Sequence, residues 1–458
     1  MPLKLSRNQR TLFFSAVTVL AVGSVCFLTF FNKPQELDVV LITIDALRAD
    51  HLGCYGYNRD TSPNIDALAR EGTLFTQAIA QASWTPPSVG IITTSTYPPT
   101  HRLLDWGDTL NPDIPTLAES LKARGYKTVF AGANPAFRDG LHGSSRGFDE
   151  FYNEGVPASV LTQKASELVG KDRSKPFFLW IHYMDVHDYA PSKEFEGLYV
   201  NDKFYDKQKK LPIIKSVAGR YSFRGIADFR AKKHGGIDNP DYYVALYDSA
   251  IRSVDQQIGF LLGNLAPATG NRKTLVIITA DHGEMLGEHG CYFHHRTFLY
   301  EPLLKVPFIL HCPNKVPIKK VDAQIRAGLD VLPTVLSALK IKRPAVIQGV
   351  ALIPTLTKSG AGSSYVLSET YHRTSVRTDD WKLIRFSGEE GFSGNYELFH
   401  LKSDPGEMNN LAFVEKTHLA SLKEKLDEHD EKFPNTRTPS PALSERAREG
   451  LKTLGYLQ

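Results

Sequence analysis

The sequence has little cysteine and little excess charge. Four cysteines occur in 458 residues, and none has the spacing of a zinc finger or of a disulfide framework. The formal net charge is +4, too small for this length to indicate nucleic-acid binding. Internal repeats are also absent. These absences exclude a disulfide-stapled scaffold, a zinc finger and a solenoid. The 42% hydrophobic and 23% charged residues are ordinary for a globular protein.

The N-terminus has the pattern of a membrane anchor. Three basic residues precede an apolar run over 11–31, which is long enough to cross a bilayer. No small-x-small cleavage pattern follows the run, so we expect an uncleaved anchor, with a cleaved signal peptide as the alternative. Basic residues before the span favour a cytoplasmic tail at 1–10. The remainder of the chain would then lie in the periplasm or outside the cell.

Residues 37–355 alternate between strand-like and helix-like patterns. The runs 38–44 and 274–280 are apolar throughout, which is typical of buried parallel strands. Apolar residues three and four apart predict a long helix over 243–265. We therefore expect one α/β catalytic domain, with a mostly parallel central sheet covered by helices on both faces.

Residues 356–458 have a different character. The runs 375–386 and 396–401 are strand candidates joined by a glycine-rich turn, a hairpin signature. A charged helix with leucines on one side follows. This part is predicted to form a small α+β subdomain.

One stretch of the catalytic domain is strongly basic. Ten Lys or Arg residues and two acids, Asp206 and Asp228, lie between Lys203 and Lys233. Either this is a solvated insertion, or it is a contact surface for an anionic substrate or for lipid headgroups.

Acidic and imidazole side chains follow the two buried strands. Asp45 comes directly after the first strand, and Asp281 and His282 come directly after the second. Chemistry in open α/β sheets lies beyond the carboxyl ends of the strands, so we expect these side chains to meet at one edge. Oxygen ligands suit calcium, magnesium or manganese, and an added imidazole also suits zinc. The pattern predicts a site for one of these divalent cations.

Thr85 is the predicted nucleophile. The two prolines that follow it are favourable at a helix start, so Thr85 should lie at or just before a helix N-terminus. Backbone N–H groups stabilise an anion there, and a nearby cation makes a hydroxyl easier to ionise. The alternative is that Thr85, or Ser83 or Ser88, is simply an N-cap.

Histidines gather at two further places. His182 and His187 follow the strand-like run 177–181, and a second group that includes His289 and His295 follows Asp281. Three strand ends that carry Asp or His favour one shared site.

These motifs, in this order and over most of the chain, resemble those of the sulfatase family of the alkaline phosphatase superfamily. The matching segments are 45–50, 61–66, 85–88, 182–187, 281–283, 300–301, 330–334, 376–384 and 397–399. The resemblance implies an alkaline phosphatase-like fold with a metal site at Asp45, Asp281, His282 and the nucleophile oxygen of Thr85. It also implies substrate contacts from His187 and from either His295 or Arg296.

The sequence departs from the family pattern at several of these positions. Sulfatases carry Cys or Ser at the Thr85 position and oxidise it to formylglycine, and they have an Arg where Val89 stands here. A second aspartate often follows the first, where this chain has Ala46. The Gly-Lys-x-His element of the family would fall near Gly132, where no lysine is present.

These departures favour chemistry at phosphorus over sulfate-ester hydrolysis. A formylglycine hydrate has a second hydroxyl that expels sulfate, whereas a threonine ester must be cleared by water or another acceptor. We expect a membrane-anchored hydrolase or transferase that acts on phosphate or sulfate esters. Thr85 would attack, and His187 or a histidine from the 289–295 cluster, such as His295, would protonate the leaving group. The alternatives are a sulfuric ester hydrolase without formylglycine and an inactive binding protein. The substrate would be an anionic small-molecule, lipid or glycan ester, and no nucleic acid is expected as a partner.

Overall fold

The computed structural model describes residues 37–434 apart from 135–136, 138–142, 173, 212–234, 270–271, 357–361, 371 and 387–395. The predicted tail and anchor, most of the basic stretch and the chain beyond residue 434 lie outside the described residues. Within the described part, no helix combines the length and the apolarity that a bilayer span requires.

The core of the fold is an eight-stranded mixed sheet in the order β10-β2-β9-β6-β1-β5-β3-β4. All neighbours in it are parallel except β9, which runs antiparallel to β2 and β6. The prediction of a mostly parallel central sheet is therefore confirmed. The strands are β1 (Leu37–Ile44), β2 (Thr73–Ile79), β3 (Lys127–Gly132), β4 (Glu150–Asn153), β5 (Phe177–Tyr183), β6 (Lys273–Thr279), β9 (Phe308–His311) and β10 (Lys319–Arg326).

Strand β1 lies at the centre, and its register sets the positions of the residues at its end. Every residue of β1 is buried, as expected for a strand with sheet neighbours on both sides and helices above and below. Thr43 is paired with His182 of β5 on one side and with Thr279 of β6 on the other. The three strands therefore end at nearly the same level, and the residues that follow them meet at one edge.

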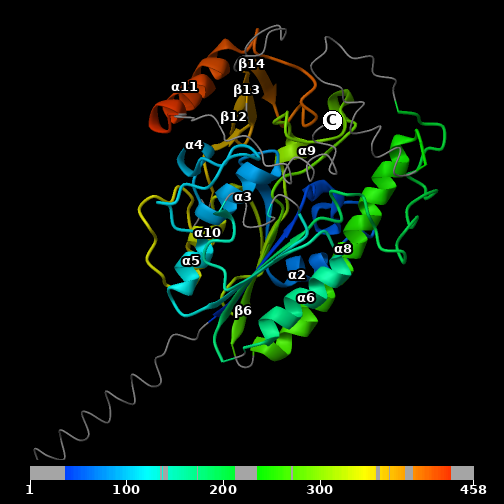
Figure 1. The fold of residues 1–458 in the computed structure, drawn as a ribbon. Coiled ribbons are helices and arrows are strands. Elements are labelled where there is room, and N and C mark those ends of the chain that lie inside the picture. Colours follow the sequence, from blue (N-terminus) through cyan, green and yellow to red (C-terminus); the bar gives the residue numbers. More distant parts are fainter. Residues whose placement is uncertain are drawn as a thin grey trace, which may run out of the picture.

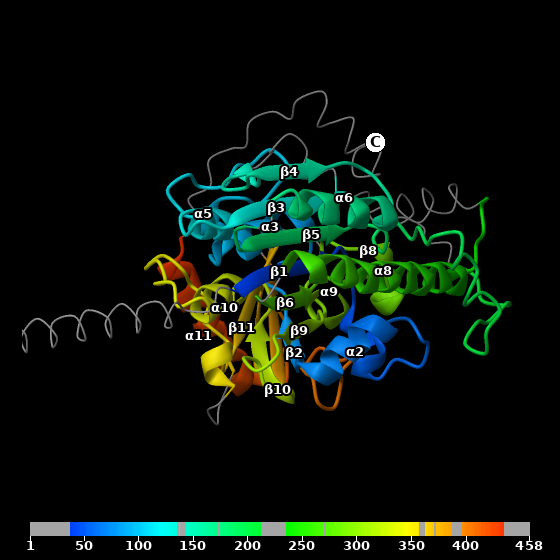
Figure 2. The same ribbon diagram turned by 90° about the horizontal axis from the view of Figure 1, so that it is seen from below.

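Helices cover both faces of the sheet (Figures 1 and 2). One face is covered by α2 (Pro63–Glu71), α6 (Ala158–Gly170) and α8 (Pro240–Thr269), and the other by α3 (Thr85–Thr94), α5 (Leu117–Lys122) and α10 (Val331–Ala338). Helix α8 includes the predicted range 243–265 and is longer at both ends. Its apolar stripe is buried, from Tyr243 to Leu265. Short elements complete this part: η1 (Ala49–His51), η2 (Gly53–Tyr55), α4 (Pro98–His101), β7 (Met285–Leu286), η4 (Glu288–Gly290), β8 (Tyr292–His294), α9 (Glu301–Leu304) and η5 (Ile353–Thr355).

A second, antiparallel sheet lies beyond the carboxyl ends of the main strands (Figure 1). Its strands are β11 (Val366–Glu369), β12 (Arg373–Arg377), β13 (Trp381–Phe386) and β14 (Tyr396–His400), and the helix α11 (Lys416–Lys432) packs on it. The run 375–386, predicted as one strand, forms parts of two. A tight turn between Thr378 and Trp381 interrupts it. The Trp381 N–H donates to the Thr378 side-chain oxygen at 3.0 Å, and the Thr378 N–H donates to the Trp381 carbonyl.

The second sheet is bonded to the segment that leads from β2 into α3. The Ser368 hydroxyl donates to the Ala80 carbonyl at 2.7 Å, and the Glu369 N–H donates to the Gln81 carbonyl at 2.8 Å. This segment ends at Thr85, the first residue of α3. The C-terminal sheet therefore supports the backbone that carries the predicted nucleophile.

A buried charge cluster also joins the second sheet to α9. The Lys382 ammonium of β13 is fully buried and lies 3.2 Å from Glu301 Oε1 and 2.8 Å from Glu407 Oε1. Arg377 of β12 pairs with the same Glu301 at 3.0 Å. Burial raises the pKa of Glu407 to about 7, whereas the Arg377 and Lys382 charges outweigh burial and lower the pKa of Glu301 to about 2.

Candidate metal centre and active site

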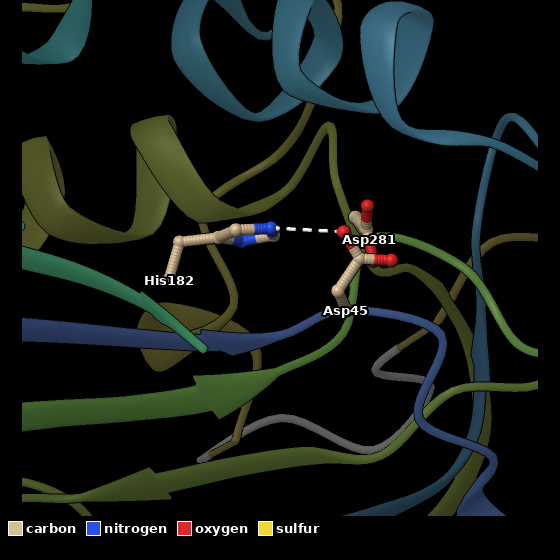
Figure 3. Close-up of side chains that lie close together, drawn as sticks. All are labelled: Asp45, His182 and Asp281. Carbon is tan, nitrogen blue, oxygen red and sulfur yellow. Dashed lines mark hydrogen bonds and ion pairs between the residues drawn. The ribbon is translucent and has the colours of Figure 1, made fainter. Parts of the chain in front are cut away.

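Three buried side chains converge at the carboxyl edge of the main sheet (Figure 3). Asp45 follows β1, His182 lies in β5, and Asp281 follows the end of β6. One ligand atom from each lies within 4.8 Å of the others. The parallel register of β1, β5 and β6 produces this convergence, because residues that leave parallel strands at the same level become neighbours.

Two carboxylate oxygens in this cluster lack hydrogen-bond partners. Asp45 Oδ1 and Asp281 Oδ2 are buried and accept no hydrogen bond from the described residues. Burying a charged oxygen without a donor costs several kcal/mol unless a cation compensates for it. The arrangement fits a divalent cation, and the donor set of carboxylate oxygens and imidazole fits the metal site of the predicted family.

The two aspartates experience opposite electrostatic effects. Burial acts to raise the pKa of Asp45, but His187, His182 and His282 together hold it well below its usual range. Burial and the charge of Asp45 raise the pKa of Asp281. Two carboxylates this close cannot both ionise easily without a positive charge between them.

His282 points its Nε2 atom at the same two carboxylates. This atom lies 3.5 Å from Asp45 Oδ1 and 3.4 Å from Asp281 Oδ2. Its Nδ1 atom lies 2.8 Å from the Gly283 carbonyl, which keeps the proton on Nδ1 and leaves Nε2 as a ligand atom. Gly283 is needed here because a Cβ atom at this position would lie 2.0 Å from the Pro302 carbonyl oxygen.

The Thr85 hydroxyl lies beside Asp45 and His282 of this cluster. It is the first residue of α3, and its Oγ1 atom lies 3.4 Å from both Asp45 Oδ2 and His282 Nε2. The N-cap position belongs to Trp84, and prolines occupy the first turn. The hydroxyl is therefore directed into the carboxylate cluster at the positive end of a helix, where an oxyanion is stabilised.

Of the other predicted site residues, His187 and His295 lie next to this cluster. The His295 ring stacks on His282 with centroids 4.6 Å apart, and the His187 ring lies 5.0 Å from His295. The pKa of His295 is held well below its usual range by burial and by the neighbouring histidines.

Arg296 is directed elsewhere. Its backbone is in the left-handed region, with a φ of 85°. The guanidinium lies 4.2 Å from the centre of the Trp84 ring and 3.3 Å from Asp105. Its predicted contact with the substrate stays a prediction.

Three residues of the site were not singled out as ligands or partners in the sequence. His182 Nε2 lies 3.1 Å from Asp45 Oδ2, and Asn134 Nδ2 donates to the same oxygen at 2.6 Å. Glu284 lies 3.2 Å from His295 Nδ1. His182 lies near the end of β5, and Asn134 lies just beyond the end of β3. Their position at strand ends is the sequence signal that could have identified them.

Comparisons with known proteins agree with this geometry. A family model described as Sulfatase matches residues 38–341. The chain belongs to the sulfatase family. A second model, described as the C-terminal part of N-sulphoglucosamine sulphohydrolase, matches residues 287–433. The protein is thus a sulfatase-family ester hydrolase with a buried Asp/His metal site.

Relatives with known names are similar over most of the chain. An N-acetylglucosamine-6-O-sulfatase of Bacteroides thetaiotaomicron is 24% identical over 83% of this chain and 83% of its own length. An ulvan-active sulfatase of Formosa agariphila is 27% identical over 86% of this chain and 78% of its own.

Solved structures share the fold. A structure in complex with its substrate, D-glucosamine-2-N, 6-O-disulfate, superposes with a TM-score of 0.70 at 21% identity, covering 89% of this chain and 100% of that one. The phosphonate monoester hydrolase of Agrobacterium radiobacter superposes with a TM-score of 0.69 at 18% identity, covering 87% and 96%.

Proposed function

We propose that the protein is a membrane-anchored sulfatase-family enzyme in which Thr85 attacks a phosphate or sulfate ester. The position of the Thr85 hydroxyl carries this proposal, because Oγ1 lies 3.4 Å from both Asp45 Oδ2 and His282 Nε2. A nucleophile must lie within reach of the group that activates it, and this hydroxyl does.

The chain's own residues have separate parts in this reaction. Asp45, Asp281 and His282 hold a divalent cation, and such a cation lowers the pKa of the Thr85 hydroxyl and neutralises charge on the ester oxygens. The α3 N-terminus stabilises the negative charge that develops during attack. His187 or His295 lies close enough to exchange a proton with the leaving group or with water.

The choice between phosphorus and sulfur depends on Thr85. Threonine cannot become formylglycine, so the route by which a formylglycine hydrate expels sulfate is closed to this chain. A threonine ester must instead be attacked directly by water or another acceptor. This chemistry supports phosphoester hydrolysis or phosphoryl transfer as the leading activity.

A second candidate is hydrolysis of sulfate esters on glycans. The names of the relatives favour it, because they include an N-acetylglucosamine-6-O-sulfatase and an ulvan-active sulfatase. Both candidates share an anionic ester as the substrate, and the glycan would be the group that leaves. The predicted anchor at 11–31 would place the enzyme in the periplasm or outside the cell.

The test is a panel of aryl phosphate monoesters, diesters, phosphonates and sulfates, assayed with and without chelator. We expect the activity to need a divalent cation and Thr85→Ala to lose turnover by a factor of at least about 1,000 while keeping its fold. The neighbouring Ser88→Ala variant is the matched control on the same helix turn. Full activity of purified Thr85→Ala would refute the nucleophile, and a preference for the sulfate would favour the second candidate.

A further inference from the structure

A cavity of about 750 Å³ lies away from the metal centre, where α11 faces the main domain. Its wall is formed by Tyr97, Arg326, residues of the segments 343–348 and 362–367, and the end of α11. Tyr97 lies just after the last residue of α3, whereas Thr85 is the first residue of that helix. The helix α3 is about 15 Å long, so this length separates the cavity from the predicted nucleophile. Pockets that bind small molecules usually measure about 300–1,000 Å³, and this cavity falls within that range.

The inner part of the wall is held in place by hydrogen bonds. Arg326 Nη2 lies 3.2 Å from Oδ1 of the buried Asp330, and Arg326 Nη1 donates to the Gln348 carbonyl at 3.3 Å. The side-chain oxygen of Gln348 in turn accepts a hydrogen bond from the Tyr97 N–H. Because these contacts are made within the protein, the wall keeps its shape without a ligand, and binding requires little reorganisation.

The exposed part of the wall carries more positive than negative charge. Arg343, Lys432 and Glu428 line it and are exposed to solvent. Within the part of the chain that the structure describes, none of these three belongs to an ion pair. Deeper in the cavity, the charge of Arg326 is already balanced by Asp330. Two cations against one carboxylate favour a ligand with a single negative group.

The remaining wall combines aromatic rings with hydroxyl and amide groups. The half-buried Tyr365 and Phe433 line the cavity together with Ser363, Ser364 and Gln348. Aromatic rings pack well against apolar C–H faces, whereas hydroxyl and amide groups need hydrogen-bond partners. A lipid chain would leave these polar groups without partners, at a cost in free energy. A sugar suits both, because its ring has apolar faces and its edge carries hydroxyl groups.

We propose that this cavity is a second binding site, which takes a sugar unit that carries one negative group. Arg343 and Lys432 hold the negative group, and Glu428 accepts hydrogen bonds from the sugar hydroxyls. The sugar ring packs on Tyr365 or Phe433. The inference goes beyond the proposed function, because none of these residues belongs to the metal centre and no bond is made or broken in the cavity.

The cavity is connected to the segment that carries Thr85. His429 lines the cavity, and its Nε2 atom lies 2.6 Å from Oε1 of Glu369 in β11. The Glu369 N–H donates to the Gln81 carbonyl at 2.8 Å, shortly before Thr85. A ligand that joins α11 to the segment 343–348 therefore also holds β11 against the main domain. Binding should raise the temperature at which the protein unfolds.

The first test is a calorimetric titration of the full chain with D-glucuronate, which has no ester bond and is not turned over. We expect one site, with an affinity at least about 10 times that for D-glucose or for acetate. The double variant Arg343→Gln/Lys432→Gln should weaken D-glucuronate binding by about the same factor, because both cations are lost. Lys342→Gln/Lys423→Gln is the matched control, since these exposed lysines do not line the cavity. Thr85→Ala should bind D-glucuronate as the wild type does.

The second test locates the bound probe. Hydrogen exchange of the backbone amides should slow at 343–348 and at 428–433 when D-glucuronate is added. The amides of 281–284, beside the metal centre, should exchange as before. D-glucuronate should also raise the unfolding temperature of the wild type and of the control by more than that of Arg343→Gln/Lys432→Gln.

The proposal is overturned if D-glucuronate gives no heat of binding up to about 10 mM, or binds no better than acetate. The full chain is titrated, so that a cavity already filled by the chain itself counts against the proposal in the same way. Loss of binding in Thr85→Ala, or wild-type affinity of the double variant, would place the probe elsewhere and also overturn it. Full activity of Thr85→Ala would instead refute the proposed function, and D-glucuronate binding would be unaffected.

Discussion

Asn134 donates a hydrogen bond from Nδ2 to Oδ2 of Asp45 at 2.6 Å. Asn134 lies just beyond the end of β3 and is buried. Its neutral amide orients the Asp45 carboxylate. We therefore regard Asn134 as a residue that positions Asp45.

Asn134→Ala should weaken metal binding. Removal of the hydrogen bond leaves the Asp45 carboxylate less firmly oriented, and loss of such a partner typically costs 10-fold to about 100-fold in metal affinity. Calorimetric titration of the chelator-treated protein measures this change. Asn409→Ala, at an exposed turn, should leave the affinity unchanged. An Asn134→Ala protein with wild-type affinity would contradict this role.

Asp281→Asn should have opposite effects on the metal-free and metal-loaded protein. Without metal, the variant removes the repulsion between Asp281 and Asp45 and should unfold at a higher temperature than the wild type. With metal at about 100 times its Kd, the wild type should gain about 2.7 kcal/mol, and the variant should gain little. Thermal denaturation with chelator and then with calcium, magnesium, manganese or zinc measures both effects. A metal-induced stabilisation that survives in the variant would remove Asp281 from the ligand set.

Lys382→Met should destabilise the fold strongly. The substitution leaves Glu301 and Glu407 buried without the ammonium that they share, and breaking such a pair typically costs about 3–5 kcal/mol. Urea denaturation measures the loss. Lys402→Met is a control, because that lysine is 73% exposed and solvent weakens its pair with Asp380. Equal effects of the two substitutions would mean that the buried cluster has no special importance.

Glu407→Gln should change how stability depends on pH. The pKa of Glu407 is raised in the folded protein from 4.5 to about 7, so the folded state binds more protons between these values and stability falls as pH rises through them. The pKa of Glu301 is lowered to about 2, so its contribution is present above its unfolded pKa and is lost as pH falls towards 2.

Glutamine at position 407 removes the first of these effects. The unfolding free energy of Glu407→Gln should therefore fall less than that of the wild type between about pH 5 and about pH 8. Denaturant titrations at these two pH values test this. The same pH dependence of the unfolding free energy in the wild type and in Glu407→Gln would show that Glu407 does not titrate as stated.

Much of the fold and site follows from the sequence because strand ends can be recognised locally. The run 177–181 is apolar throughout and lies in β5, and the ends of β1 and β6 bring Asp45 and Asp281 together as predicted. The Thr85 hydroxyl also reaches this point, because prolines fix the start of α3.

The remaining residues depend on information that is not local. His182 joins the cluster through the register between β1 and β5, which pairs it with Thr43, and a single strand does not specify its partner's register. His295 and Arg296 are adjacent in the sequence, yet His295 stacks on His282 whereas Arg296 lies against Trp84. The turn at Thr378 divides one apolar run into two strands through a side-chain hydrogen bond that hydrophobic periodicity does not reveal.

The hydrogen bonds from Ser368 and Glu369 to the segment before Thr85 have a consequence for synthesis. A nascent chain that has emerged from the ribosome as far as β10 already contains the aspartates, the histidines and Thr85. It lacks β11, the strand that bonds to the segment before Thr85. Activity should therefore arise late in translation, after β11 has emerged.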